Sequence, residues 1–117
     1  MEEKLPGGDY TAIIASTKAV EFESGSVALL LQLIVARGPH RGRRCEKKLF
    51  FPFDQVQLAK SQFVRLGGAL RSLATVGEDA LELVGSLLSI QLSYDDVGRQ
   101  KVLVFRQLGR DDVKRYL

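Results

Sequence analysis

The chain has 117 residues, of which 45% are hydrophobic and 26% charged, with a net charge of +3 and an isoelectric point near 9.2. This composition excludes wholesale disorder, and the length predicts a single domain with a loose leader at residues 1–5 and a short C-terminal tail at residues 109–117. The mild positive charge permits nucleic-acid binding without requiring it, so the case for such binding depends on how the charges cluster along the chain.

Cys45 and His40 are the only cysteine and histidine in the chain. One residue of each type cannot build a Cys/His zinc site, and a lone cysteine excludes an internal disulfide and is typical of a reducing compartment. The acidic N-terminus lacks the apolar core of a secretory signal, and no stretch reaches the roughly 20 apolar residues of a membrane helix. We therefore expect a cytoplasmic protein without a cofactor, a metal or a membrane partner.

Two strands are predicted in the first third of the chain. The first covers residues 10–20 and is interrupted near Thr17 and Lys18. The second, residues 26–36, is apolar on both alternating sets, which indicates a strand covered on both faces. A helix is the competing interpretation of this Leu-rich stretch, and the turn signals that flank it favour the strand.

Three further strands are predicted at residues 43–51, 87–94 and 101–108. Pro52 stops the third strand and Gly109 the fifth, after which Asp111 is expected to cap the basic tail.

One helix is predicted between the third and fourth strands. Asp54 is the expected N-cap, and Gly67-Gly68 the expected C-terminus, after which the pattern resumes over residues 69–74. The apolar stripe of this helix consists of Val56, Ala59, Phe63, Leu66 and Leu70. We expect residues 76–79 to form a loop and residues 80–84 a single short turn.

The predicted order β-β-β-α-β-β is that of a mainly β protein, a five-stranded OB-fold-like Greek-key barrel with one helix between strands three and four. The helix would close one end of the barrel. The usual ligand surface of that fold lies on strands two and three and the loops beside them.

Positive charge is concentrated between the second and third strands. Glu46 is the only acidic residue between positions 37 and 48, and the basic side chains of this stretch are Arg37, His40, Arg41, Arg43, Arg44, Lys47 and Lys48. Cations beside a run of phenylalanines could hold a polyanion and stack its bases. The competing interpretation is an edge hairpin whose charges prevent aggregation. Lys101 and Arg106 on the fifth strand are additional candidate phosphate contacts.

Strand alternation assigns different roles to two neighbouring aromatic residues. If Leu49 and Phe51 point into the barrel, Phe50 points outward beside Lys48 and Arg44, where its ring could stack on a base. A bulge in the third strand would exchange Phe50 and Phe51.

The sequence resembles a family of small phage and prophage proteins that bind single-stranded DNA. The similarity extends from about Leu5 to Leu108 and lies in the motifs LPGGDYTA at residues 5–12, GPHRGR at 38–43, Phe63-Leu66-Gly67 and Leu83-Val84-Gly85. It implies an OB-fold protein in the cytoplasm of a bacterial host that coats single strands during phage replication or recombination. The basic C-terminus departs from the acidic recruiting tail of cellular single-strand binders.

No enzymatic reading is favoured by the sequence. The acidic pairs 78–79, 95–96 and 111–112 lie where turns or helix caps favour aspartate. Glu46-Lys47-Lys48 matches half of a metal-dependent nuclease motif, but the preceding strand carries no second carboxylate. We expect a single-stranded DNA-binding protein that is not an enzyme. The alternative is a protein-interaction module of a phage recombination complex that does not bind DNA, and more remotely a metal-dependent nuclease. Phage recombination or replication proteins are the further partners expected, and a homo-oligomer is left open.

Overall fold

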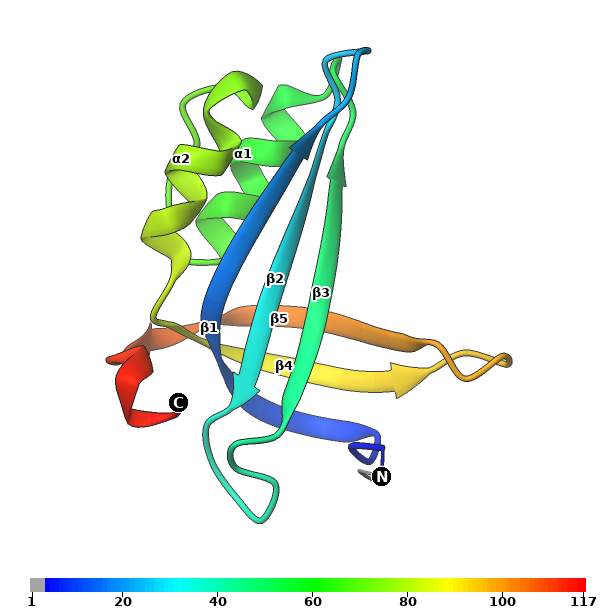
Figure 1. Cartoon of the computed structure of the whole chain (residues 1–117), viewed down its shortest axis with the longest axis vertical. Helices are drawn as coiled ribbons and strands as arrows, with labels where there is room; N and C mark the ends of the chain where they lie inside the picture. The colour runs from blue at the N-terminus through cyan, green and yellow to red at the C-terminus, as the bar shows by residue number, and fades with distance from the viewer. Residues whose placement is uncertain (1–3) are drawn as a thin grey trace.

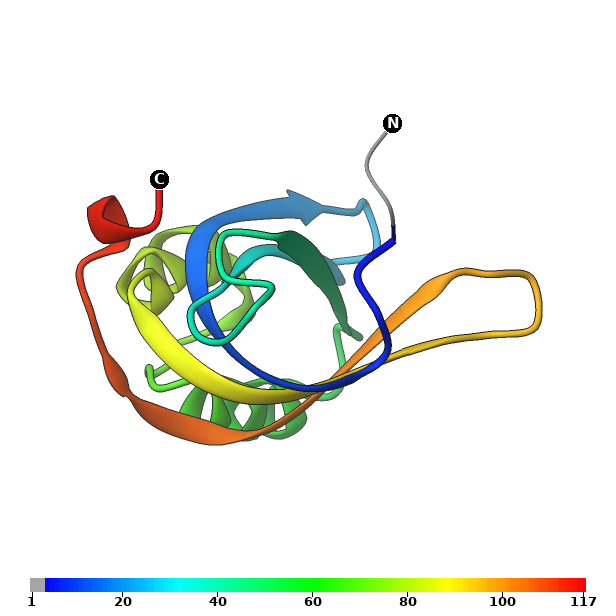
Figure 2. The same cartoon turned by 90° about the horizontal axis from the view of Figure 1, so that it is seen from below.

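The computed structural model describes residues 4–117. Its strands are β1 (Gly8–Glu21), β2 (Val27–Val35), β3 (Arg44–Phe51), β4 (Ser86–Tyr94) and β5 (Gln100–Arg110). They form one antiparallel sheet in the order β3-β2-β1-β4-β5, so that β3 and β5 lie at its two edges. The sheet curls strongly into a half-barrel, as the view along its axis shows (Figure 2). The mainly β class and the five strands are as predicted.

The long strand β1 joins the two halves of the sheet. Its first part pairs with β4 and its second part with β2, and a register shift lies between Ile14 and Ser16. A bulge bends a strand and increases its twist, and β1 curves visibly along its length (Figure 1). The predicted interruption at Thr17 and Lys18 is wrong, because both residues pair with β2.

Strand β2 supplies the centre of the core. The side chains of one alternating set, Val27, Leu29, Leu31, Leu33 and Val35, are each at most 2% exposed. On the opposite face Ala28 and Leu30 are only half-buried, and Ile34 is buried. The prediction of a strand is confirmed and the helix alternative is wrong, but the second face is fully covered only near Ile34.

The connection from β3 to β4 contains more helix than the single one expected. It comprises α1 (Val56–Arg65), a 3-10 turn (Leu73–Thr75), α2 (Val76–Asp79) and a second 3-10 turn (Ala80–Leu83). The prediction of a loop at residues 76–79 is therefore wrong. Val76, Ala80 and Leu83 recur at helical spacing and are all buried in the core, which explains why this segment coils.

Helix α1 closes the space beside the upper part of the sheet (Figure 1). Phe63 is fully buried, and its ring lies 6.0 Å from that of Phe51 on β3. The helix begins after Gln55 without a side-chain cap, so Asp54 is not the N-cap that we expected. Its C-terminus is as predicted: Gly67 has φ +93°, and the amides of Gly67 and Gly68 donate to the carbonyls of Val64 and Phe63.

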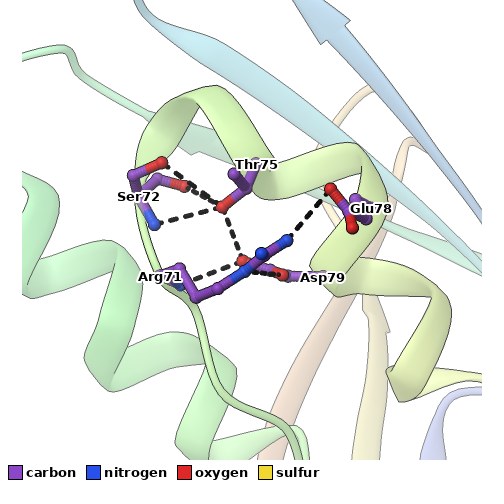
Figure 3. A network of polar contacts seen from close by, with 5 residues as sticks. All are labelled: Arg71, Ser72, Thr75, Glu78 and Asp79. Carbon is purple, nitrogen blue, oxygen red and sulfur yellow. Dashed lines mark hydrogen bonds and ion pairs between the residues drawn. The ribbon is translucent and has the colours of Figure 1, made fainter.

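A polar network fixes the path from α1 to α2 (Figure 3). The buried Asp79 carboxylate accepts hydrogen bonds from the Arg71 amide at 2.9 Å, the Arg71 Nε at 2.8 Å and the Thr75 hydroxyl at 2.7 Å. These bonds, led by that from the Arg71 amide, lower the pKa of Asp79. Asp79 thus stabilises the helical connection and does not lie in the turn that its sequence neighbours suggested.

Both chain ends differ from the predicted loose segments. Residues 1–3 of the expected leader lie outside the described residues, and Leu5 is buried in the core at 3% exposure. Strand β5 continues through Gly109 to Arg110, so the tail begins two residues later than expected. Its 3-10 turn, Val113–Arg115, is capped by Asp112, which accepts from the Lys114 amide, and not by Asp111.

The tail folds back onto the outside of the sheet. Val113 and Tyr116 pack on a second, smaller apolar cluster formed by Ile13, Ile34, Ala36 and Leu87. The Asp111 carboxylate accepts a 2.6 Å hydrogen bond from the Tyr116 hydroxyl, and the Arg41 guanidinium lies 5.1 Å from the centre of the Tyr116 ring. Among residues 4–117, no helix is long and apolar enough to span a bilayer.

Candidate nucleic-acid interface

The outer face of β1, β2 and β3 carries an exposed apolar surface. Phe50 lies opposite Ala28, which in turn lies opposite Val20; one step along the strands, Lys48 lies opposite Leu30, which lies opposite Lys18. We call this surface the aromatic patch and define it by Val20, Phe22, Ala28, Leu30 and Phe50, with Lys18 and Lys48 beside them. These seven side chains line a shallow hollow of about 350 Å³.

Two phenylalanines are the most exposed apolar side chains of the aromatic patch. Phe50 is 57% exposed and Phe22 48% exposed, and their rings meet edge to face with centroids 6.0 Å apart. Phe51 is 2% exposed, so the predicted orientation of Phe50 and Phe51 is confirmed and the bulged alternative is wrong. Whether Phe50 stacks on a base stays a prediction.

A groove runs between the free edge of β3 and the hairpin of β4 and β5. Its walls include Arg44 and Lys48 on β3 and Arg99 and Lys101 near the hairpin turn. The part between Arg44 and Arg99 has a volume of about 680 Å³. Within residues 4–117, neither Arg44, Lys48 nor Lys101 forms an ion pair with an acidic side chain. Their charges are available to a ligand in the groove.

Three polar residues, Gln32, Glu46 and Gln100, complete the wall of the groove. The Glu46 carboxylate accepts a 3.0 Å hydrogen bond from the side-chain amide of Gln32. The Glu46 backbone amide donates to the side-chain oxygen of Gln100 across the groove at 3.3 Å. Arg99 is held by Asp95, whose carboxylate accepts from the Arg99 amide and guanidinium. Those bonds lower the pKa of Asp95, chiefly through the Arg99 amide, so that it stays ionised and positions the turn.

Lys47 has a different surrounding from its neighbour Lys48. Its ammonium donates a 2.6 Å hydrogen bond to the carbonyl of Val102 on β5, and burial lowers its pKa. Alternation explains the difference, because Lys47 shares the inner side of β3 with Leu49 while Lys48 faces outward. Lys47 thereby joins the two edges of the sheet, and we leave it out of the proposed interface.

The cations of the β2–β3 loop point in different directions. Arg41 stacks on Tyr116, whereas Arg37 and His40 line a hollow beside the start of β1. Arg43 is half-buried and Arg44 lies in the groove. The strand from Arg44 to Phe50 is about 20 Å long at roughly 3.3 Å per residue. The structure therefore separates the loop cations from the phenyl ring that we expected beside them.

The two candidates on β5 also lie apart. Lys101 is exposed and lines the groove near Lys48. Arg106 is exposed opposite Ser89, outside the groove. Three residues that the sequence analysis did not select, Lys18, Phe22 and Arg99, lie in the patch or the groove. Alternation along Lys18, Val20 and Phe22 indicates that Lys18 and Phe22 share one face of the strand. Their position beside Phe50 depends on the order of the strands and could not be read from the sequence.

Neither a reactive thiol nor a metal cluster accompanies the groove. Cys45 is buried, and burial raises the pKa of its thiol to about 11, so the thiolate that would react is not formed at neutral pH. In the part of the chain that the structure describes, no three His, Cys, Asp or Glu side chains are grouped so that they could hold a metal ion.

Comparison with known proteins identifies no relative of the chain. No family model, no curated protein and no solved structure matches the chain.

Proposed function

We propose that this protein binds single-stranded DNA, with little sequence preference, across the outer face of β2 and β3 and the groove beside them. The observation that carries the proposal is the exposed pair Phe22 and Phe50, with Lys18 and Lys48 in the next row along the strands. Bases stack on exposed aromatic rings, and cations next to the rings bind the phosphates that connect the bases.

The groove supports the same proposal by its charge. Arg44, Lys48, Arg99 and Lys101 line the groove, a channel next to the aromatic patch; Glu46 is the acidic residue in its wall, and Asp95 pairs with Arg99. A strand whose bases rest on Phe50 would have its backbone in this channel. Contacts of this kind bind any sequence, because they read phosphates and ring faces instead of base edges.

The connectivity supports assignment to the OB-fold. The sheet order β3-β2-β1-β4-β5, with β1 shared by both halves and helices between β3 and β4, agrees with a partly open five-stranded Greek-key barrel. In that fold strands two and three form the usual oligonucleotide surface, which is where the aromatic patch and the groove lie. We extend the proposal to phage replication or recombination on the motifs described in the sequence analysis.

A second candidate function is a protein-interaction module without DNA binding. It is favoured by the apolar part of the aromatic patch, where Val20, Phe22 and Phe50 are each close to half exposed or more. A contiguous apolar surface of this kind also fits a protein partner. The two functions differ in their salt dependence, because only phosphate contacts release counterions.

The deciding experiment is a fluorescence-anisotropy titration with labelled single-stranded DNA, duplex DNA and RNA of equal length. We expect preferential binding to the single strand, with an affinity that falls steeply as salt rises from low to physiological concentration. No binding at low salt, or binding that ignores salt, would reject the proposal and favour the protein-interaction module.

Phe50→Ala supplies the residue-level test. Removing the ring should weaken single-strand binding about tenfold, the lower range of the energy of stacking on one base. Phe105→Ala is the matched control, since Phe105 on β5 is 50% exposed and lies outside the patch and the groove. Equal losses for the two variants would show that Phe50 has no special role.

A further inference from the structure

A second hollow lies at the opposite end of the β2–β3 hairpin from the aromatic patch. It has a volume of about 580 Å³ and is bordered by the start of β1, by Ser89 on β4 and by residues 37–40 of the loop. The loop is held in place by backbone hydrogen bonds: the Ala36 amide donates to Thr11, and the Gly42 amide donates to Val35. A preorganised loop of this kind loses little entropy when a ligand binds.

The hollow combines aromatic rings with a cation. His40 and Tyr10 are half-buried, and their rings meet edge to face with centroids 6.0 Å apart. The Tyr10 hydroxyl donates to the Pro6 carbonyl, which fixes the direction of its ring. Arg37 is exposed at the rim and, within residues 4–117, forms no ion pair.

The aromatic rings and the guanidinium of this hollow are suited to binding a single nucleotide. A base can stack on an aromatic ring such as that of His40, while the guanidinium of Arg37 is suited to a phosphate because it offers several donors in one plane. Asp9 also borders the hollow and opposes an anion, and among residues 4–117 Arg37 is the one guanidinium in its lining, whereas the groove is lined by several cations; the site should therefore be weaker than the groove. Arg41 is not part of it, because its guanidinium lies over Tyr116.

We infer that this hollow is a second nucleotide-binding subsite, which a DNA strand reaches only after it has filled the groove. The inference rests on the proposed function and adds a length requirement to it. The length of β3 alone, about 20 Å from Arg44 to Phe50, separates the patch from the loop. Short oligomers therefore occupy the patch and the groove, and only longer ones also place a nucleotide between Arg37, His40 and Tyr10.

The test is a length series of oligothymidylates from about 4 to about 16 nucleotides, the range of site sizes of single OB-folds. It compares the wild-type protein with the double variant Arg37→Ala/His40→Ala. We expect equal affinities for the shortest oligomers and a loss of about tenfold for the longest, the contribution of one stacked base. Arg65→Ala is the control, because Arg65 is an exposed cation on α1 outside the hollow and the groove.

A gain of affinity provides an independent readout that misfolding cannot imitate. Asp9→Asn removes the negative charge at the rim and should strengthen binding of the long oligomers alone. No loss in the double variant, or the same proportional loss at every length, would overturn the second subsite. Absence of wild-type binding at every length would instead reject the proposed function itself, so the two failures are distinguishable.

Discussion

The outer face of β1 and β2 carries apolar side chains at both ends, but only one end is covered by another segment of the chain. At one end Ile13, Ile34, Ala36 and Leu87 are covered by Val113 and Tyr116 of the C-terminal tail and are at most 9% exposed. At the other end the aromatic patch stays open, with Phe50 and Phe22 close to half exposed.

This contrast supports the open end as the binding surface of the proposed function. The chain uses its own tail to cover the apolar residues that serve folding, as folded proteins usually do with a large apolar surface. It leaves uncovered the residues that have lysines beside them. The four predictions below test whether the covered end contributes to stability and the open end to binding.

The largest difference in stability is expected between substitutions at two neighbouring positions of β3, one on its buried face and one on its exposed face. Phe51→Ala removes a buried ring that contacts Phe63 and should lower the free energy of unfolding by about 3–5 kcal/mol. Phe50→Ala removes an exposed ring and should change it by no more than about 0.5 kcal/mol. Urea denaturation of both variants measures these values. A large cost for Phe50→Ala would mean that the patch is structural.

A smaller difference should separate the covered end from the open end. Tyr116→Ala removes the hydrogen bond to Asp111 and part of the cover over Ile34, and should cost about 1–2 kcal/mol of stability. Phe22→Ala, the matched change in the open patch, should cost about 0.5 kcal/mol or less. The comparison fails if both variants unfold at the same denaturant concentration.

The attachment of the tail should also depend on pH. The hydrogen bond from Tyr116, followed by those from the Asp112 amide and Arg115, lowers the pKa of Asp111 from 3.8 to about 2. A carboxyl with a lowered pKa stabilises the fold above its unfolded value, and that stabilisation is lost as pH falls through about 2. The stability difference between wild type and Asp111→Asn should therefore be constant at neutral pH and shrink below about pH 4. A difference independent of pH would contradict this.

The smallest effect concerns the cations of the open end. Lys48→Ala should reduce the slope of log affinity against log salt by about 0.7, the value for one phosphate contact with a single strand. Phe50→Ala should weaken binding with the slope unchanged, since stacking releases no counterions. Anisotropy titrations at several salt concentrations measure both slopes. An unchanged slope for Lys48→Ala would place the phosphates elsewhere.

Alternation was a sufficient guide to the strands. The pattern predicted the five strands to within a few residues and placed Phe50 outside and Phe51 inside, because side-chain period and burial are coupled in a sheet. The same rule, applied to Lys47, would have separated it from Lys48. The capping pattern was a poorer guide to the start of the helical connection, where Asp54 resembles a cap in sequence but makes no capping bond.

The sequence pattern could not predict contacts between segments that are distant in the chain. Nothing near Val113 or Tyr116 in sequence indicates that they cover Ile34, and nothing near Phe22 indicates that it meets Phe50. Both contacts depend on the order and curvature of the strands. The expected single cluster of loop cations failed for the same reason, because the curled sheet directs Arg37, Arg41 and Arg44 to three different places.

The hydrogen bond from Lys47 to Val102 has a consequence for the mechanics of the groove. Strands β3 and β5 stand at the two ends of the sheet order, so no ladder of backbone pairs holds these edges together. In the described chain, the hydrogen bonds that link them come from side chains, at Lys47 with Val102 and at Glu46 with Gln100. The groove can therefore widen by releasing two side-chain bonds while each strand keeps its neighbours, and under the proposed function its width would adjust to bases of different size.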